Sequence, residues 1–158
     1  MVSLICGKIA SGKSTLAAKL ALNSNTVLLS EDRWLSGLYP HEIKSLEDYA
    51  KCSQRLREVL TSHILQLAKC NINLVLDFPA NTLNQRAWFK EMLGSAGVEY
   101  ELHFLDVSDD TCKSRLKKRN ESGLHAFQTS EHEFDIFTRH FVKPTENEGF
   151  KIISQQTR

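Results

Sequence analysis

The chain has 158 residues, of which 41% are hydrophobic and 25% are charged, and these values suit one compact α/β domain that buries its own core. Its 20 lysines and arginines nearly balance 19 aspartates and glutamates. The net charge of +1 excludes a global attraction to nucleic acids or acidic membranes, so any preference for a polyanion must be local.

The cysteines and histidines lack the spacing of metal ligands. The four cysteines form no CxxC pair, and three of them lie in apolar patterns typical of buried thiols, which favours a reduced, cytoplasmic protein. No apolar run approaches the roughly 18 residues of a membrane span, and the N-terminus shows no signal peptide pattern. We therefore expect a soluble cytoplasmic protein that has no membrane partner and no histidine-bound metal.

The first 41 residues predict a strand, a glycine-rich turn, a helix and a second strand. An apolar run at residues 2–6 ends at Gly7, and apolar residues then recur at helical spacing over residues 16–21. Residues 26–30 predict the second strand, followed by a polar loop through His41. A short helical turn that begins at Glu31 remains open as the alternative.

The middle of the chain predicts a long helix and a buried strand. Apolar residues keep a 3.6-residue period from Leu46 to Leu67, about six turns, and Ser45 is the expected N-cap. Residues 72–76 form a near-continuous apolar run, which is typical of a strand buried on both faces of a parallel sheet. Together with the first elements, this order predicts a βαβ arrangement.

The rest of the chain continues the alternation of strands and helices. Further strands are predicted at residues 100–107 and 150–153. Capping residues predict three helices: one opened by a Thr82 and Gln85 capping box and closed by Gly94, one from Ser108 to about Arg119, and one that starts at Ser130 and Glu133. This alternation predicts a doubly wound parallel α/β sheet in a single domain over residues 1–158.

One segment matches the phosphate-binding P-loop at every fixed position. Residues 7–14 read Gly-Lys-Ile-Ala-Ser-Gly-Lys-Ser, which fits GxxxxGK[ST] between a strand and a helix. Backbone N–H groups in such a loop surround the β-phosphate, the lysine reaches the β- and γ-phosphates, and the serine hydroxyl binds Mg²⁺. We therefore expect ATP to be bound by Gly7, Ala10, Ser11, Gly12, Lys13, Ser14 and Thr15, with Ser14 also holding Mg²⁺ and Lys13 also catalytic.

Four charged residues follow the second and third predicted strands, where they would face the phosphate loop. Asp32 is the candidate general base for an acceptor hydroxyl, with Glu31 as the spare, and Arg33 is a candidate substrate-binding residue. A solvated loop cluster is the alternative. Asp77 has the position of a Mg²⁺-binding carboxylate after a buried strand, although it also fits the start of a turn before Pro79.

A basic helix near residue 115 predicts a lid. Arg115 and Arg119 are four residues apart and share one helix face, and Gly123 follows in a polar loop able to move. Arginines that a moving lid brings to the phosphates stabilise charge on a transferring phosphoryl group. We therefore expect both to be catalytic within a short lid around residues 113–128. The alternative is a solvated basic face, because three lysines share this helix.

These motifs resemble the small P-loop kinases that include chloramphenicol phosphotransferase, the zeta toxins and the kinase domain of polynucleotide kinase, a group of AAA-type ATP-binding proteins. The resemblance covers nearly the whole chain and implies a nucleoside-monophosphate-kinase-like P-loop NTPase fold. It assigns the phosphate loop to residues 7–15, the general base to Asp32 and the lid arginines to Arg115 and Arg119.

The same resemblance implies an asparagine and an arginine after the third strand, here Asn81 and Arg86, with Arg86 in substrate binding. The segment from Asp77 to Asn81 is longer than in the relatives and contains a proline. Residues 141–150 look like a feature of one bacterial subgroup, placed near the adenine.

The expected function is an ATP-dependent phosphotransferase that moves the γ-phosphate to a hydroxyl of a small molecule. A polynucleotide or nucleoside 5′-hydroxyl kinase is the first alternative, although the charge balance argues against nucleic acid as a partner. A nucleotide-binding regulator with slow ATP hydrolysis is the second. Neither the acceptor nor the oligomeric state follows from the sequence.

Overall fold

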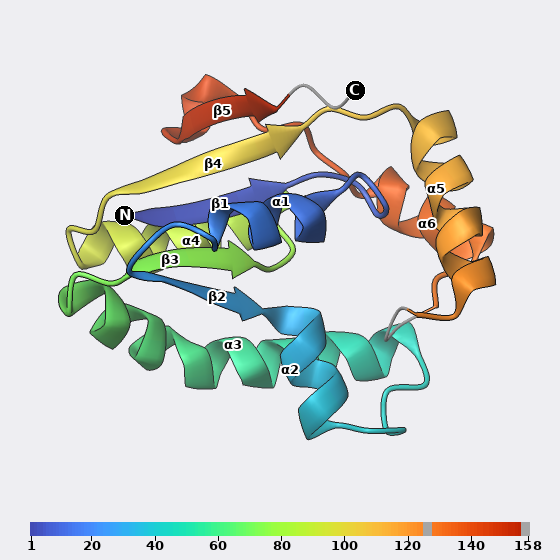
Figure 1. The fold of residues 1–158 in the computed structure, drawn as a ribbon, viewed down its shortest axis with the longest axis horizontal. Helices are drawn as coiled ribbons and strands as arrows, with labels where there is room; N and C mark the ends of the chain where they lie inside the picture. Colours follow the sequence, from blue (N-terminus) through green and yellow to red (C-terminus); the bar gives the residue numbers. More distant parts are fainter. Residues whose placement is uncertain (125–127, 156–158) are drawn as a thin grey trace.

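The computed structural model describes residues 1–124 and 128–155. Within them, five parallel strands form one sheet in the order β2-β3-β1-β4-β5 (Figure 1). The strands are β1 (Val2–Cys6), β2 (Thr26–Ser30), β3 (Asn73–Asp77), β4 (Tyr100–Leu105) and β5 (Lys151–Gln155). The predicted α/β fold with a parallel sheet is confirmed.

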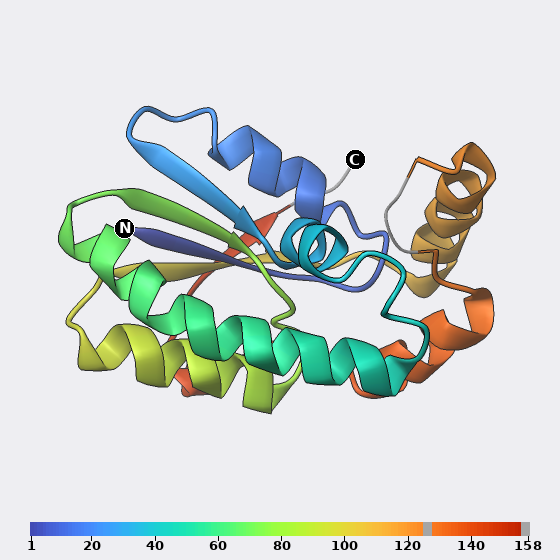
Figure 2. The ribbon, with the colours of Figure 1, turned by 90° about the horizontal axis from the view of Figure 1, so that it is seen from below.

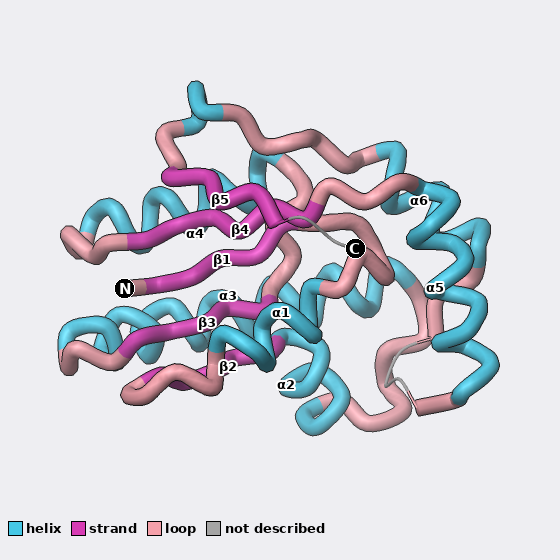
Figure 3. Tube along the Cα trace, turned by 45° about the horizontal axis from the view of Figure 1, so that its top comes forward, coloured by secondary structure: helices cyan, strands magenta, loops and turns pink. Residues whose placement is uncertain are grey.

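Helices cover both faces of this sheet and its carboxyl end. In Figure 2, α1 lies on one face, and α3 and α4 lie on the other. Figure 3 shows α5 and α6 beyond the carboxyl ends of the strands. The helices are α1 (Lys13–Leu20), α2 (Glu31–Leu38), α3 (Leu46–Lys69), α4 (Leu83–Ser95), α5 (Asp109–Ser122) and α6 (Glu131–Arg139), with a 3₁₀ turn η1 (Glu146–Glu148) before β5.

The core has two layers because successive residues of a strand point to opposite faces of the sheet. All five residues of β1 are buried. Leu4 and Cys6 pack in the layer that contains the inner faces of α3 and α4, whereas Ile5 packs with Ala17 of α1 and Leu116 of α5. A strand buried on both sides fits the apolar run that predicted it.

The strand register brings the loops of the candidate site to one edge. Ser30 at the end of β2 lies opposite Asp77 at the end of β3, and Cys6 at the end of β1 lies opposite Phe104 of β4. In a parallel sheet the carboxyl ends of all strands lie at the same edge. The segments that follow β1, β2 and β3 therefore open into one crevice.

The prediction of a polar loop after the second strand is wrong, because residues 31–38 form the helix α2. The open alternative of a helical turn from Glu31 describes this segment better. The buried residues of α2 are Glu31 and Leu35, four apart on one face. A buried glutamate in place of an apolar residue conceals the helical pattern.

The prediction that the helix opened by Thr82 ends at Gly94 is also wrong. The helix α4 continues through Gly94 to Ser95, and the chain turns at Gly97, which has a φ of 64°. Gly97, rather than Gly94, supplies the left-handed conformation typical of helix ends. The Thr82 and Gln85 capping box is confirmed, as are the caps Ser45, Ser108 and Ser130.

Other boundaries differ by a few residues from those expected. The helix expected to end near Arg119 reaches Ser122 and ends at Gly123, and the strand expected over 100–107 ends at Leu105. Cys6, Cys52 and Cys112 are buried and Cys70 is exposed, as the apolar patterns indicated. In the described part of the chain, no helix has the length and apolar character that crossing a bilayer requires.

Candidate active site

The phosphate loop joins β1 to α1, and two glycines make its geometry possible. A Cβ atom on Gly7 would lie 2.5 Å from the Ser11 hydroxyl oxygen, a distance that real Cβ atoms do not tolerate. Gly12 has a φ of 104° and precedes α1 without a side-chain cap. The first N–H groups of α1 therefore remain available for an anion, as at phosphate-binding helix N-termini.

Lys13 lies at the start of α1, with its ammonium folded back over the loop. Its Nζ donates a hydrogen bond to the Lys8 carbonyl at 2.8 Å. Burial lowers the pKa of Lys13, and the neighbouring carboxylates of Asp77 and Asp32 oppose this shift. The loop lysine and both predicted carboxylates thus share one electrostatic environment.

The two acidic residues after β2 have different surroundings. Glu31 is buried, where its carboxylate accepts hydrogen bonds from Ser53 and, at 2.9 Å, from the Tyr49 hydroxyl. Burial raises the pKa of Glu31, and these hydrogen bonds offset only part of the rise. Asp32, by contrast, lines the cleft next to the phosphate loop. The geometry favours Asp32 over Glu31 as a group that meets a ligand.

The two predicted lid arginines both reach the cleft from α5. Arg115 donates from Nη1 to the Ser11 carbonyl of the phosphate loop at 3.2 Å. Arg119 is half-buried, and its Nε has no hydrogen-bond partner among the described residues. Burial lowers the pKa of Arg119, whereas the charge of Asp32 raises it. A buried guanidinium N–H without a partner is a ready donor to an anionic ligand.

These elements enclose a cleft of about 920 Å³ at the carboxyl edge of the sheet. Its polar lining combines the phosphate loop, the carboxylates that follow β2 and β3, and the α5 arginines, while apolar side chains come from α3, α6 and the loops before and after them. The lining includes Ala10, Ser11, Gly12, Lys13, Ser14, Thr15, Asp32, Asp77, Arg115 and Arg119, together with Ile43, Leu46, Tyr49, Asn81, Phe137 and Phe141.

The structure does not bring the remaining predicted site residues into this cleft. Arg33 is exposed on α2 and is not part of the lining. Arg86 is fully buried, and its guanidinium binds the Glu148 carboxylate and the Ala80 carbonyl. Gly7, the first residue of the loop, is buried. In this structure Arg86 is part of the protein interior, and neither arginine lies where a substrate in the cleft would meet it.

Two hydrogen-bonded contacts of the phosphate loop have no sequence signal of their own. The Lys8 ammonium binds the Asp109 carboxylate at the start of α5 and lies 5.7 Å from the Phe141 ring centroid. The Asn81 side chain accepts a hydrogen bond from the Gly7 N–H at 3.0 Å. The sequence distances are 101 and 74 residues, so no local pattern could have revealed these pairs.

The donor set for a divalent cation is small. No group of three or more histidine, cysteine, aspartate or glutamate side chains suitable for a metal occurs within residues 1–124 and 128–155. Ser14 and Asp77 both line the cleft, next to the loop that would hold phosphates. One carboxylate and one hydroxyl fit Mg²⁺, which keeps several waters and takes its other ligands from nucleotide phosphates.

The overall fold is shared with solved structures of kinases. A candidate kinase from Chloroflexus aurantiacus superposes with a TM-score of 0.76 and 17% identity, over 97% of this chain and 85% of that one. A sugar kinase from Janibacter gives a TM-score of 0.65 and 14% identity, over 98% and 83%. A chain of the Pnkp1/Rnl/Hen1 RNA repair complex gives 0.68 and 16%, over 88% of this chain and 43% of that one.

Sequence comparison gives a family as well as a fold. No curated protein matches the chain significantly. A family model described as an AAA domain matches residues 2–144, which is most of the chain and includes the phosphate loop, the carboxylates and the α5 arginines. The chain therefore belongs to this AAA domain family and has the fold of the small P-loop kinases.

Proposed function

We propose that this protein is an ATP-dependent kinase that transfers the γ-phosphoryl group of ATP to a hydroxyl of a small molecule. The observation that carries the proposal is the joint presence of Lys13, Asp32 and Arg119 in the lining of one cleft. These residues provide phosphate binding, proton acceptance and charge stabilisation, the three tasks of phosphoryl transfer.

Asp32 is proposed as the residue that orients the acceptor and takes its proton. The acceptor oxygen bonds to the γ-phosphorus, the bond from that phosphorus to the ADP oxygen breaks, and the hydroxyl proton moves to the Asp32 carboxylate. The neighbouring Tyr49 is held by its hydrogen bond to Glu31, which keeps this wall of the cleft in place. The Glu31 carboxylate already accepts hydrogen bonds from Tyr49 and Ser53.

The cations of the cleft would meet the negative charge of the nucleotide. Lys13 and the first N–H groups of α1 are proposed to bind the phosphates, and Arg119 to stabilise the charge of the transferring group. Arg115 supports the loop through the Ser11 carbonyl. Ser14 and Asp77 are the proposed holders of Mg²⁺, which when bound would neutralise negative charge on the nucleotide phosphates.

Several parts of the proposal come from the sequence. The proposal treats residues 1–158 as one domain with a short lid around 113–128, and residues 125–127 of this lid lie outside the described residues. It places the protein in the cytoplasm and assigns it no membrane partner. The placement of residues 141–150 near the adenine remains a prediction.

A small-molecule acceptor is favoured by the lining near Asp32. Ile43, Leu46 and Tyr49 bring apolar side chains to the lining and Lys44 and Ser45 bring polar ones, a mixture suited to a compact organic molecule. The sugar kinase among the similar structures acts on such a molecule, as its name states. The second candidate is a 5′-hydroxyl kinase for a nucleic acid or nucleoside, because a chain of an RNA repair complex has the same fold.

The first experiment asks whether the phosphate loop is used. We expect Lys13→Ala to abolish nearly all phosphoryl transfer while the fold remains, because Lys13 supplies charge to the phosphates and its loss removes only one hydrogen bond within the loop. Label transfer from γ-labelled ATP into a panel of hydroxyl compounds measures the activity, and circular dichroism checks the fold. Normal turnover by a folded Lys13→Ala protein would contradict the proposed function.

A further inference from the structure

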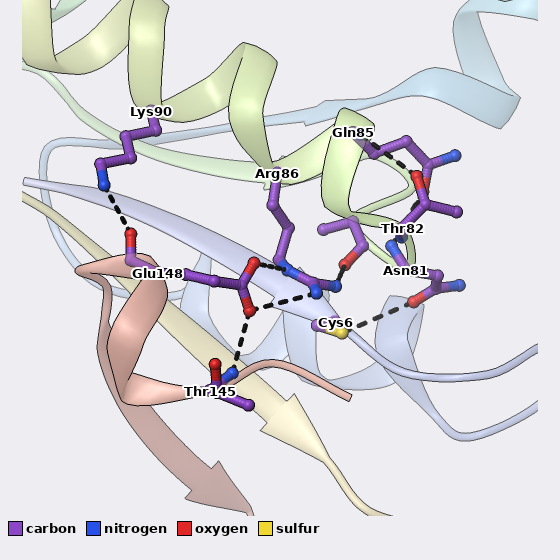
Figure 4. Close-up of polar contacts among 9 residues, drawn as sticks. Cys6, Asn81, Thr82, Gln85, Arg86, Lys90, Thr145 and Glu148 are labelled. Carbon is purple, nitrogen blue, oxygen red and sulfur yellow. Dashed lines mark hydrogen bonds and ion pairs between the residues drawn. The ribbon is translucent and has the colours of Figure 1, made fainter. Parts of the chain in front are cut away.

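Asn81 lies between β3 and α4 and holds the first residue of the phosphate loop. Its Oδ1 accepts hydrogen bonds from the Gly7 N–H at 3.0 Å and from the Cys6 thiol at 3.6 Å, the second of which Figure 4 shows. Asn81 is half-buried and lines the cleft. It thus connects the loop after β3 to the point where β1 becomes the phosphate loop.

The orientation of this side-chain amide follows from its partner. A backbone N–H can only donate, so the atom of Asn81 that faces Gly7 must be the oxygen, and the NH₂ group must point elsewhere. Figure 4 shows the amide nitrogen turned away from Cys6. The contribution of Asn81 to the phosphate loop is therefore that of an acceptor, which an aspartate at the same position would retain.

The backbone around Asn81 is fixed on both sides of the side chain. The Asn81 N–H donates to Gln85 Oε1 at 2.8 Å, and the Asn81 carbonyl accepts from the Val142 N–H, also at 2.8 Å. The preceding carbonyl, that of Ala80, accepts from Arg86 Nη1 at 2.9 Å. Three separate contacts therefore hold Asn81 in the position from which it reaches Gly7.

Arg86 extends this network to the segment before β5. Its Nε and Nη2 donate to the two oxygens of Glu148 at 2.7 and 3.2 Å, and Figure 4 shows both bonds. Glu148 is itself held by the Thr145 N–H at its carboxylate and by Lys90 at its carbonyl. Although burial acts to raise it, the pKa of Glu148 is held below its ordinary value by Arg86 and these neighbours.

We propose that Asn81 is a positioning residue for the phosphate loop, and that the buried Arg86–Glu148 ion pair holds Asn81 in place. The part of this inference that concerns ATP binding rests on the proposed function, and the part that concerns the Gly7 hydrogen bond does not. A Gly7 N–H that loses its acceptor leaves the first turn of the loop less ordered, and ATP must then restore that order when it binds. The same network makes residues 142–148 part of the support of the site.

Two variants at one position separate this role from a general loss of stability. Asn81→Ala removes the acceptor, whereas Asn81→Asp keeps an oxygen within reach of Gly7. Asn84→Ala is the matched control, because Asn84 is an exposed asparagine on α4 outside the cleft. Amide hydrogen exchange at Gly7, measured without nucleotide, reports the hydrogen bond directly. Titration with ATP in the absence of an acceptor gives the dissociation constant.

We expect Asn81→Ala to speed exchange at Gly7 and to raise the ATP dissociation constant about tenfold, the worth of one hydrogen bond of about 1.4 kcal/mol. Asn81→Asp should restore protection at Gly7, although its added charge will itself repel ATP. Asn84→Ala should match the parent in both measurements. A larger effect on the ATP dissociation constant than on saturated turnover is expected, because the loop binds ATP in the ground state as well.

Three results would overturn the assignment: parental Gly7 exchange in Asn81→Ala, parental ATP affinity in that variant, or Gly7 exchange in Asn81→Asp as fast as in Asn81→Ala. If Asn81→Ala does not fold, Glu148→Gln tests the same support, and unchanged exchange at Gly7 would contradict it. A parent protein that binds no ATP would contradict the proposed function instead, since Gly7 exchange is measured without nucleotide.

Discussion

At the scale of single residues, burial separates the two carboxyl groups that begin α2. Glu31 is 1% exposed and bonded to α3, while Asp32 lines the cleft. A general base must reach the proton that it accepts, and a carboxylate already occupied by Ser53 and Tyr49 is poorly placed to do so. The contrast identifies Asp32 as the residue to substitute.

We predict that Asp32→Asn lowers kcat by about 10²- to 10⁴-fold, because general base catalysis typically contributes that much, and leaves ATP affinity nearly unchanged. Steady-state kinetics with an accepted hydroxyl compound give kcat, and calorimetry gives the ATP dissociation constant. If ATP binding falls in parallel with turnover, Asp32 is instead a metal-binding or structural residue.

Arg119 offers a second test at this scale. Its buried Nε has no partner among the described residues, so an anion at this point of the cleft would gain a charged hydrogen bond. We predict that Arg119→Ala reduces kcat more than it raises the KM for ATP, because a lid arginine acts mainly on the transition state. Lys118→Ala, an exposed neighbour outside the cleft, is the control. Equal kcat in Arg119→Ala and the parent would make α5 a solvated basic face.

At the scale of elements, the fold was predictable wherever a helix or strand carries its own pattern. The apolar run of β1 and the six-turn stripe of α3 depend only on periodicity, and both occur where expected. The helix α2 was missed because its buried face contains Glu31, whose partners are supplied by α3. A charged residue that is buried through tertiary contacts leaves no signal in its own segment.

The candidate site divides in the same way. The phosphate loop is contiguous in sequence, so residues 7–15 were identified from their spacing alone. The roles of Asn81 and Arg86 depend on partners more than 60 residues away, Gly7 and Glu148. Sequence separation hid these contacts. The family resemblance placed Arg86 in substrate binding, whereas the structure buries it in an ion pair with Glu148.

The packing of α2 against α3 leads to a pH-dependent prediction. Burial raises the pKa of Glu31 above its ordinary 4.5, Asp32 adds to the rise, and the bonds from Ser53 and Tyr49 and the charge of Arg57 offset part of it. The unfolded chain thus loses this proton at a lower pH than the folded one. The stability that Glu31 contributes to the fold is fully present below about pH 4.5, and it falls as the pH rises towards the pKa of Glu31 in the folded protein.

We predict that Glu31→Gln removes this dependence, since an amide does not titrate and its oxygen can still accept from Ser53 and Tyr49. The free energy of unfolding of Glu31→Gln relative to the parent should increase with pH above about 4.5, by at most about 1.4 kcal/mol per pH unit. Urea denaturation of both proteins from acidic to neutral pH measures it. Parallel stability curves would show that Glu31 does not titrate differently on folding.

At the scale of the whole molecule, charge and shape decide between the two acceptor classes. The net charge is +1, and several cations in or beside the cleft are engaged within the protein, whereas Lys19 and Lys44 are exposed in its lining. Lys8 is paired with Asp109, Arg115 holds the phosphate loop, and Lys113 binds Glu131 and Asp135 of α6. Cations engaged in this way add little to the binding of a phosphate backbone.

A nucleic-acid acceptor would behave differently from a small molecule as salt is raised. Each backbone phosphate neutralised by the protein contributes about one unit to the slope of log affinity against log salt. Aromatic side chains on which bases could stack are few near the proposed acceptor wall, where Tyr49 is engaged with Glu31.

We predict that single-stranded oligonucleotides bind only near the roughly 10⁻⁴ M level of non-specific association and are poor acceptors. Fluorescence anisotropy with a labelled oligonucleotide at several salt concentrations measures the affinity and its slope, and γ-labelled ATP measures transfer to a 5′-hydroxyl end. Micromolar binding with a steep salt slope, together with label at the 5′ end, would replace the small-molecule acceptor with a nucleic acid, while the roles proposed for Lys13 and Asp32 would remain.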